Sequence, residues 1–423
     1  MTGYDTIVIG AGIAGMTTAC GLAQSGQKVL VLAKGLGALL LASGCIDVLG
    51  FQPADSLEPV TNPAAKLSEF AAARPDHPYA WLGQETIESG LTAFMQLVQS
   101  QGLDYRGDFQ HNWRLPSTIG AVHPTCLAPA SLAAGDFSQG GRWLIVGFSH
   151  LRDFYPALLA DNLNQQNFGV QADAVSLDLS VPVASPLNAT PLELAHAFEQ
   201  EEFRRQVIQS LSGRLKGIDR VGFPAVLGVS RHQAVLSDLE KGLGKPVFEI
   251  SALPPSVPGR RLFEALKAAF LKAGGRIIVG GPVVDGAIVD GKVTHVRLET
   301  ASRLKPLRAG AYVLATGGIF GGGLVAQPDG KVTEPIFGLP VTMPADRHQW
   351  FETRFVSAQG QPVARAGLAV TSDLRPRNGD SAPLATNLYV AGTLLAIADW
   401  TGSRIGDGLA LACAAAIVKQ LTR

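Results

Sequence analysis

Three glycines near the start of the chain have the spacing at which a backbone can hold a phosphate. Gly10, Gly12 and Gly15 form G-x-G-x-x-G between an apolar run and a segment with helical spacing. In this pattern the first glycine permits a tight turn, the second lets a phosphate approach the backbone, and the third allows close helix–strand packing. The unpaired N–H groups and the dipole of the helix start favour an anion there. The pattern predicts a nucleotide-binding βαβ unit.

The second strand of this unit departs from the usual dinucleotide pattern. The run "KVLVLAK", residues 28–34, ends in Ala33 and Lys34, where an acidic residue that binds ribose is expected. Ala33 cannot accept hydrogen bonds from the ribose hydroxyls. Three interpretations are open here: FMN, which has no adenosine; FAD, with another group holding the ribose; or NADP, whose 2′-phosphate pairs with Lys34.

Small residues follow two later apolar runs. The segment "AYVLATGG", residues 311–318, predicts a buried strand that ends beside Thr316 and Gly317. The segment "NLYVAG", residues 387–392, predicts another strand, which ends at Gly392. Glycine and other small residues let a second backbone or a cofactor come close. We therefore expect Thr316, Gly317 and Gly392 to contact the cofactor.

A glycine turn precedes the last helix of the chain. The turn "GSRIGDG", residues 402–408, opens a long Ala-rich segment, and its Gly406 and Gly408 are candidates for cofactor binding. A helix start stabilises an anionic group through its dipole. Two further candidates, Ser43 and Gly44, follow the second predicted strand.

Candidates for catalysis lie in the middle of the chain. Arg260 and Arg261 follow "LPPSVPG" at the start of a predicted helix, and guanidinium groups suit a phosphate. An exposed first helical turn is the alternative for both. His232, in "SRHQ" after a strand-like run, is a candidate general base, with a structural histidine as the alternative. Weaker candidates of the same kind are His123, His150, His348, Arg354 and Arg375.

Composition excludes several classes of protein. The 35 basic and 35 acidic residues among 423 cancel, and no basic run is present, which argues against a nucleic-acid partner. The four cysteines are far apart, so their spacing fits neither an iron–sulfur cluster nor a zinc site, and we predict no metal. No apolar stretch reaches the ~20 residues that span a bilayer. We expect a cytoplasmic protein.

The order of predicted strands and helices indicates an α/β fold with an inserted domain. We predict a split Rossmann-type flavin-binding domain made of residues 1–55, 256–340 and 366–423. An inserted α/β cap or substrate domain comprises residues 56–255, with 341–365 returning across the cleft. The cap is expected to have a small sheet of its own, because strand and helix patterns alternate there. A hairpin turned at Asp290-Gly291 is also predicted.

The three glycine-rich segments, in this order, resemble the flavoprotein superfamily with a split FAD-binding domain. In that superfamily the N-terminus of the last helix points at the flavin and stabilises its reduced, anionic ring. The resemblance implies that Gly406 and Gly408 lie at this edge of the flavin. Asp407 stands where the superfamily has a second glycine, and a carboxylate there opposes an anionic flavin unless it is turned away.

Segments along the whole chain narrow the resemblance to the B subunits of the anaerobic glycerol-3-phosphate dehydrogenases. They are "ASGCIDVLG", "WLIVGFSHLRDFYPALLADNL", "GFPAVLG", "LPPSVPGRRL", "ATGGIFGGGLVAQPDGKVTEPIFGLPV" and "TSDLRP". The resemblance implies a flavin subunit with FMN, and FAD as the alternative. It also implies a flavin dehydrogenase partner and an iron–sulfur partner that anchors the complex to the inner face of the cell membrane. The activity implied is oxidation of sn-glycerol 3-phosphate to dihydroxyacetone phosphate, or relay of its electrons to quinone.

Two other functions fit the same residues. A stand-alone FAD-dependent oxidoreductase of another small polar substrate needs no partner and reduces a soluble acceptor. A non-catalytic nucleotide-binding assembly subunit has either no tightly bound flavin or a flavin that no substrate reduces.

Overall fold

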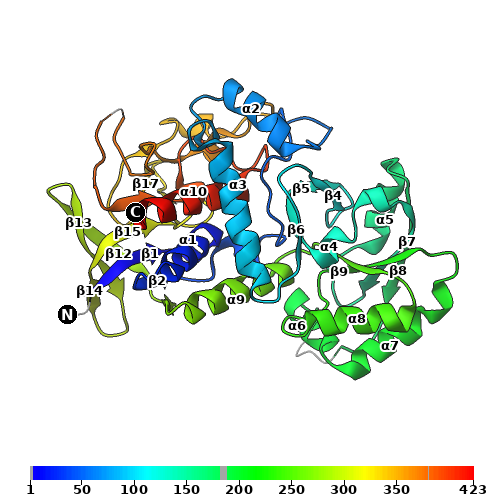
Figure 1. The fold of residues 1–423 in the computed structure, drawn as a ribbon. Helices are drawn as coiled ribbons and strands as arrows, with labels where there is room; N and C mark the ends of the chain where they lie inside the picture. Colours follow the sequence, from blue (N-terminus) through cyan, green and yellow to red (C-terminus); the bar gives the residue numbers. More distant parts are fainter. Residues whose placement is uncertain (1–2, 182–187, 380) are drawn as a thin grey trace.

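The larger lobe is built on a parallel sheet assembled from distant parts of the chain (Figure 1). The computed structural model describes residues 3–181, 188–379 and 381–423. The sheet has the order β11-β2-β1-β15-β20 and all of its neighbouring strands are parallel. Its strands are β1 (Tyr4–Ile9), β2 (Val29–Ala33), β11 (Arg276–Val279), β15 (Ala309–Leu314) and β20 (Leu388–Val390). The predicted α/β fold with a split Rossmann-type domain is confirmed.

Three helices pack around this sheet and each has an apolar surface. Helix α1 (Ile13–Gln24) contacts both α9 (Val257–Lys272) and α10 (Gly406–Leu421). Because α1 is covered from two sides, most of its residues are buried rather than a single stripe of them. The many alanines of α10 have small side chains, so α10 can pack closely on α1.

An antiparallel sheet lies at the outer end of this lobe, near the N-terminus (Figure 1). It consists of β12 (Val283–Val289), β13 (Lys292–Glu299) and β14 (Leu304–Leu307). The β12–β13 turn is at Asp290 and Gly291, and both have positive φ, at 50° and 69°. The predicted Asp-Gly hairpin is confirmed, since these residue types tolerate that conformation.

The second lobe contains the sheet predicted for the middle of the chain. Its order is β10-β9-β7-β8, and all neighbouring strands are parallel. The strands are β7 (Gly141–Phe148), β8 (Val170–Leu177), β9 (Arg220–Pro224) and β10 (Val247–Ile250). The helices of this lobe are α5 (Pro156–Gln165), α6 (Pro191–Phe198), α7 (Glu201–Leu211) and α8 (His232–Leu243). Buried aromatic side chains, among them Trp143, Phe198, Phe223 and Phe248, fill a separate core.

The cores divide the chain later than the predicted boundary at residue 56. Helices α2 (Pro63–Ala73) and α3 (Pro78–Gln99) belong to the first core, and α3 packs directly on α10. The second core begins near Phe137 and ends at Val257. The apolar faces of α2 and α3 pack in the same core as the parallel sheet, and the predicted cap boundaries stay a prediction. Similar apolar faces could have packed on either lobe, which the sequence pattern does not distinguish.

Short strands connect the lobes. The hairpin strands β4 (Trp113–Pro116) and β5 (Val122–Thr125) pair with each other, and β3 (Tyr105–Gly107) pairs with β6 (Leu127–Pro129). The chain then passes through α4 (Ala130–Ala133) into the second lobe.

A short strand pair brackets residues 341–365, the segment predicted to return across the cleft. Strand β18 (Val341–Thr342) pairs with β19 (Gly367–Leu368), so the two ends of this segment lie side by side.

Candidate functional site

The first glycine loop brings β1, α1 and β15 into backbone contact. Gly10 has a φ of +116°, and a Cβ added to it would lie 2.2 Å from the carbonyl oxygen of Ala315. A Cβ on Gly15 would lie 2.1 Å from the carbonyl oxygen of Gly10. No larger side chain fits at either position, so both glycines are required for this close approach.

The N-terminus of α1 fits a phosphate. Its N-cap residue, Gly12, provides no side chain to accept the first N–H groups, and the first turn contains no acidic residue. A Cβ on Gly12 would meet nothing within 4 Å. A helix start without a capping side chain or an acidic residue leaves its first N–H groups and its dipole available to an anion.

The second and third predicted segments meet this loop. The Thr316 hydroxyl, just after β15, is buried without a hydrogen-bond partner, and Gly317 beside it has a φ of +79°. A Cβ on Gly392, after β20, would lie 3.0 Å from the Cβ of Ala14 in α1. The structure thus brings Gly10, Gly12, Gly15, Thr316, Gly317 and Gly392 together. We call these six residues the glycine cradle, and its orphaned hydroxyl and small residues fit a flavin nucleotide.

The cradle continues to the start of α10. The backbone N–H of Gly318 donates to the Thr393 hydroxyl at 3.3 Å. A Cβ on Gly406 would lie 3.8 Å from the Thr393 side chain. Gly408 has a different environment, because its N–H donates to the carbonyl of Asp47 at 2.9 Å. Gly406 is thus adjacent to the cradle, whereas the N–H of Gly408 is engaged within the protein.

The other predicted cofactor residues lie at the edge of this region. Lys34 is exposed just after β2. The Ser43 hydroxyl accepts the N–H of Cys45 at 3.1 Å, and Gly44 packs on Pro258 of α9. The Tyr105 hydroxyl donates to the carbonyl of Gly44 at 2.5 Å. Ser43 and Gly44 therefore hold the chain in place between β2 and the next segment.

A buried group of charged side chains lies beside the start of α10. Nε2 of His123, on β5, is 2.9 Å from Oδ1 and 3.0 Å from Oδ2 of Asp47. An Arg404 nitrogen donates to Oδ2 of Asp47 at 3.3 Å. Burial alone would raise the pKa of Asp47, but the charges and hydrogen bonds of His123 and Arg404 outweigh it and lower that pKa to about 2. Asp47 is therefore a carboxylate across the physiological pH range.

Asp407 adjoins this group through the backbone. Its Oδ2 accepts the N–H of Asp47 at 3.3 Å, so the carboxyl group is turned toward Asp47. Burial and then the negative charge of Asp47 raise the pKa of Asp407 to about 7. A large fraction of Asp407 is therefore protonated at neutral pH, and its charge opposes an anion at the helix start less than a free carboxylate would.

Two of the three predicted catalytic residues meet elsewhere, at Glu249. Arg261 pairs with both oxygens of Glu249 at 2.7 and 2.9 Å and donates to the carbonyl of Gly228. His232 is 3.8 Å from Glu249 through Nε2 and bonds the Leu227 carbonyl through Nδ1. Arg261 and Glu249 are almost fully buried. These internal contacts favour a structural role for His232 and Arg261, and their catalytic role stays a prediction.

The third residue, Arg260, directly precedes Arg261 in α9 and is partly exposed. It forms an i,i+4 ion pair with Glu264 at 2.7 Å, and 37% of its side chain is exposed. An exposed arginine of this kind is available to an anionic ligand, but no cradle residue contacts it among the interactions of the described chain.

Sequence reasoning missed Asp47 and Arg404 and gave His123 little weight. Asp47 is on a loop, His123 is on β5, and Arg404 lies just before α10. Asp47 and His123 are 76 positions apart along the chain, and His123 and Arg404 are 281 positions apart. No local spacing could group them. One sequence feature could have indicated Asp47 and Arg404: they lie within "ASGCID" and "GSRIGDG", two segments singled out for other reasons.

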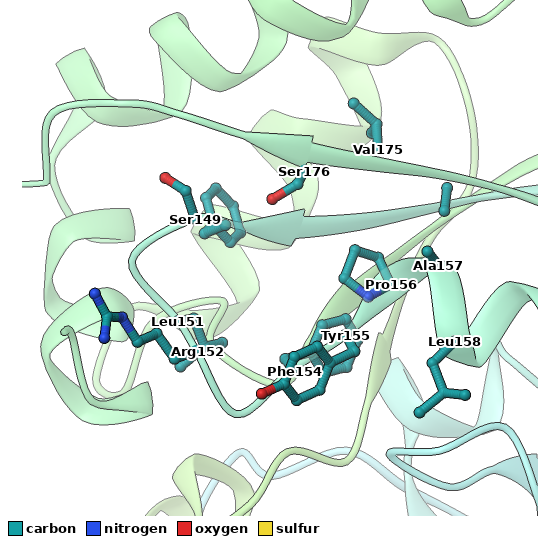
Figure 2. A pocket seen from close by; sticks show the side chains of 12 residues that line it. Ser149, Leu151, Arg152, Phe154, Tyr155, Pro156, Ala157, Leu158, Val175 and Ser176 are labelled. Atoms are coloured by element: carbon teal, nitrogen blue, oxygen red, sulfur yellow. The ribbon is translucent and has the colours of Figure 1, made fainter. Parts of the chain in front are cut away.

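A hollow of about 500 Å³ lies in the second lobe, beside the edge strand β8 (Figure 2). Mostly apolar side chains from the end of β7, the start of α5 and β8 line it. Arg152 provides its only charged lining residue, and Ser149 and Ser176 its hydroxyls. None of its lining residues belongs to the glycine cradle, so we do not place the cofactor there.

The described residues carry neither a metal cluster nor a membrane-spanning helix. No group of three or more His, Cys, Asp or Glu side chains within residues 3–181, 188–379 and 381–423 could hold a metal ion. Across the same ranges, no helix has the length and apolar character needed to cross a bilayer.

Fold and cradle define a flavoprotein of the FAD-binding class. The family described as "FAD binding domain" matches residues 5–409, so the chain belongs to it. The chain is also 31% identical to the B subunit of anaerobic glycerol-3-phosphate dehydrogenase from Pectobacterium carotovorum, over 99% of each chain. The corresponding B subunit of Vibrio cholerae is 32% identical over 100% of this chain and 97% of its own. The chain therefore belongs to this B-subunit family and is a flavin-dependent oxidoreductase subunit.

A relative from an archaeon extends the same similarity. The probable B subunit of anaerobic glycerol-3-phosphate dehydrogenase from Halobacterium salinarum is 33% identical, over 96% of this chain and 95% of its own. The similarity to the family thus covers both lobes rather than the flavin-binding lobe alone.

Proposed function

We propose that this subunit takes part in the oxidation of sn-glycerol 3-phosphate to dihydroxyacetone phosphate, with its flavin accepting the electrons. The observation that carries this proposal is the buried Asp47–His123–Arg404 group, which lies next to the start of α10 and hence next to the glycine cradle. The group combines a proton acceptor with a cation, as oxidation of a phosphorylated alcohol requires. The names of the relatives support the choice of substrate.

The chain's own residues would hold and orient the cofactor. The N–H groups at the start of α1 would bind its phosphate, and the Thr316 hydroxyl would donate its free hydrogen bond to it. A bound flavin supplies an acceptor for a hydride.

FMN is the proposed flavin, with FAD as the alternative. Ala33 closes β2 as a buried apolar residue and offers no oxygen to an adenosine ribose. The family description and the complete G-x-G-x-x-G loop favour FAD instead. The two flavins differ in mass, so the chromophore released by denaturation distinguishes them.

The proposed partners are a flavin dehydrogenase subunit and an iron–sulfur subunit that anchors the complex at the membrane. The relatives are named as the B subunits of an enzyme, which supports a multi-subunit assembly. We propose that the chain works in the cytoplasm, at the inner face of the membrane, and passes its electrons to the iron–sulfur partner.

Anaerobic reduction of the bound flavin tests this function. Flavin-loaded protein, alone and mixed with the two partner subunits, is titrated with sn-glycerol 3-phosphate while the flavin absorbance is recorded. We expect the absorbance of the flavin on this chain to fall, and glycerol to be a much poorer reductant than its phosphate. A flavin that stays oxidised both alone and in the complex would contradict the proposal.

A further inference from the structure

We propose that His123 is the general base that takes the hydroxyl proton of the substrate, that Asp47 orients it, and that Arg404 binds the anionic end of the substrate. This inference rests on the proposed function and assigns the catalytic residues within it.

The hydrogen bonds of His123 determine which nitrogen can act as a base. Nε2 lies within 3.0 Å of both oxygens of Asp47, and a carboxylate only accepts hydrogen bonds, so Nε2 carries the proton. Nδ1 of His123 then has its lone pair, and it makes no hydrogen bond with any described residue. A carboxylate on one ring nitrogen and a free lone pair on the other is the arrangement of an oriented general base.

The backbone fixes this pair of side chains next to the start of α10. Ile46 forms an antiparallel bridge with Leu127, just after β5. The carbonyl of Asp47 accepts the N–H of Gly408 at 2.9 Å, and its N–H donates to Asp407. Asp47 is thus held on both sides, and the ring of His123 is held by Asp47. From Gly406 the contacts lead through Thr393 to the glycine cradle.

The charges around the pair leave one cation available to a ligand. Arg404 uses one guanidinium nitrogen for Asp47, and 38% of its side chain is exposed. The side chains of Asp47 and His123 are only 13% and 7% exposed. Arg404 therefore forms the accessible side of the group, and its remaining N–H groups suit a phosphate.

The other titratable groups that face this site are acids that are neutral or partly neutral. Asp407 faces it from α10 with a raised pKa, because of burial and the charge of Asp47. Tyr79 on α3 donates its hydroxyl to the carbonyls of Val48 and Ile405. Burial raises the pKa of the Cys45 and Cys126 thiols and of the Tyr79 and Tyr105 hydroxyls. His123 is therefore the proton acceptor that the geometry of this set offers, because its Nε2 is held by Asp47 and its Nδ1 makes no hydrogen bond with a described residue.

The proposed step balances as a two-electron oxidation of a secondary alcohol. The O–H bond breaks and its proton moves to Nδ1 of His123. The carbinol C–H bond breaks with its electron pair, which leaves as a hydride to the oxidised flavin, and a C=O bond forms. The substrate is oxidised by two electrons, the flavin is reduced by two, and the imidazolium later releases its proton to solvent.

The kinetic test compares His123→Gln with His111→Gln. His111 is an exposed histidine just before β4, so its replacement controls for the loss of a histidine side chain near this hairpin. We expect His123→Gln to keep its flavin and its affinity for glycerol 3-phosphate. The rate at which the substrate reduces that flavin should fall about 10²- to 10⁴-fold. His111→Gln should match the wild type. Equal rates and equal pH profiles for His123→Gln and the wild type would overturn the proposal.

Two further variants separate orientation from binding. Asp47→Asn removes the charge that stabilises the imidazolium, so the acid limb of the pH–rate profile should move to lower pH. Arg404→Gln should weaken the binding of glycerol 3-phosphate and leave the weak binding of glycerol unchanged. An unmoved acid limb in Asp47→Asn, or an equal loss of both ligands in Arg404→Gln, would contradict these roles.

A measurement on the protein alone keeps this inference distinct from the proposed function. Nitrogen-15 NMR of labelled histidines should show His123 as the Nε2–H tautomer in the wild type, and inorganic phosphate should perturb this signal unless Arg404 is replaced. An Nδ1–H tautomer, or no response to phosphate, overturns the inference. If instead the tautomer and the response are as expected but glycerol 3-phosphate does not reduce the flavin, the proposed substrate is wrong and the base is not.

Discussion

At the residue scale, Asp407 shows how the fold changes the meaning of a sequence feature. In the sequence it is a carboxylate at a helix start where an anionic cofactor is expected. In the structure its carboxyl group accepts the N–H of Asp47, and burial raises its pKa to about 7. Asp47, on the loop between β2 and α2, presents its own carboxylate to His123. One acid near the helix start is thus strongly ionised and the other binds a proton readily.

Asp407 makes stability depend on pH. Its pKa in the folded protein, about 7, is above its ordinary value of 3.8, so the folded state binds more protons between these values. Stability should therefore fall as pH rises from about 4 to about 7, and level off above that. Asp407→Asn cannot ionise and should lose this part of the slope, so it should be more stable than the wild type at about pH 8.

Urea unfolding of both proteins at a series of pH values measures this effect. Asp373→Asn, at a carboxylate with 58% of its side chain exposed, is the control and should follow the wild type. An unchanged slope in Asp407→Asn would mean that Asp407 is ionised in the folded state.

Residue types and spacing singled out all six residues of the glycine cradle and neither member of the Asp47–Arg404 pair. Gly10, Gly12 and Gly15 are recognisable because a single loop must supply all three at fixed spacing. Asp47 and Arg404 are ordinary charged residues until the fold brings their segments together, and no property of either segment indicates the other.

At the element scale, the N-terminus of α1 can be tested without disturbing the fold. Gly12 has a φ of −73° and no atom within 4 Å of an added Cβ, so Gly12→Ala should fold normally. The new methyl group would occupy the space in front of the helix start. We expect flavin affinity to fall at least about tenfold with little change in the free energy of unfolding.

Gly213→Ala is a matched control for this variant, because it is also in open space but lies in the second lobe. Flavin titration by fluorescence and urea unfolding give the two quantities. Normal flavin affinity in Gly12→Ala would show that the cofactor phosphate does not bind at this helix.

A neighbouring pair of arginines on α9 tests the structural role of Glu249. Arg261→Met removes the partner of a fully buried carboxylate, and breaking such a pair costs about 3–5 kcal/mol of unfolding free energy. Arg260→Met breaks only a half-exposed i,i+4 pair and should cost less than about 1 kcal/mol. Urea unfolding measures both. Equal losses would show that Arg261 does not hold the start of α9 to the second lobe.

The double variant Glu249→Gln with Arg261→Met should recover part of the lost stability, because no unpaired charge remains. A catalytic Arg261 would give a different result, in which Arg261→Met keeps its stability and loses flavin reduction.

At the scale of the whole molecule, the order of elements was predictable and the division into lobes was less so. The split parallel sheet follows from three separate strand-and-glycine segments, which can meet only if they join one sheet. The boundary near residue 56 stays a prediction, and the structure adds that α2 and α3 bury their apolar faces in the first core. An amphipathic helix shows in its sequence which face is buried and not which lobe buries it.

The proposed base and the glycine cradle come from different parts of the chain. His123 is on the β4–β5 hairpin that precedes the second lobe, and the cradle belongs to the first (Figure 1). The proposed function and the proposed base both depend on the cradle holding a flavin.

Mass spectrometry of the chromophore released on denaturation tests whether the glycine cradle holds a flavin, with Gly12→Ala measured beside the wild type. We expect wild-type protein, purified and incubated with FMN and FAD, to release FMN, and Gly12→Ala to release much less. Release of FAD would show that another group holds the ribose near Ala33. A wild-type protein that retains neither flavin would contradict both proposals.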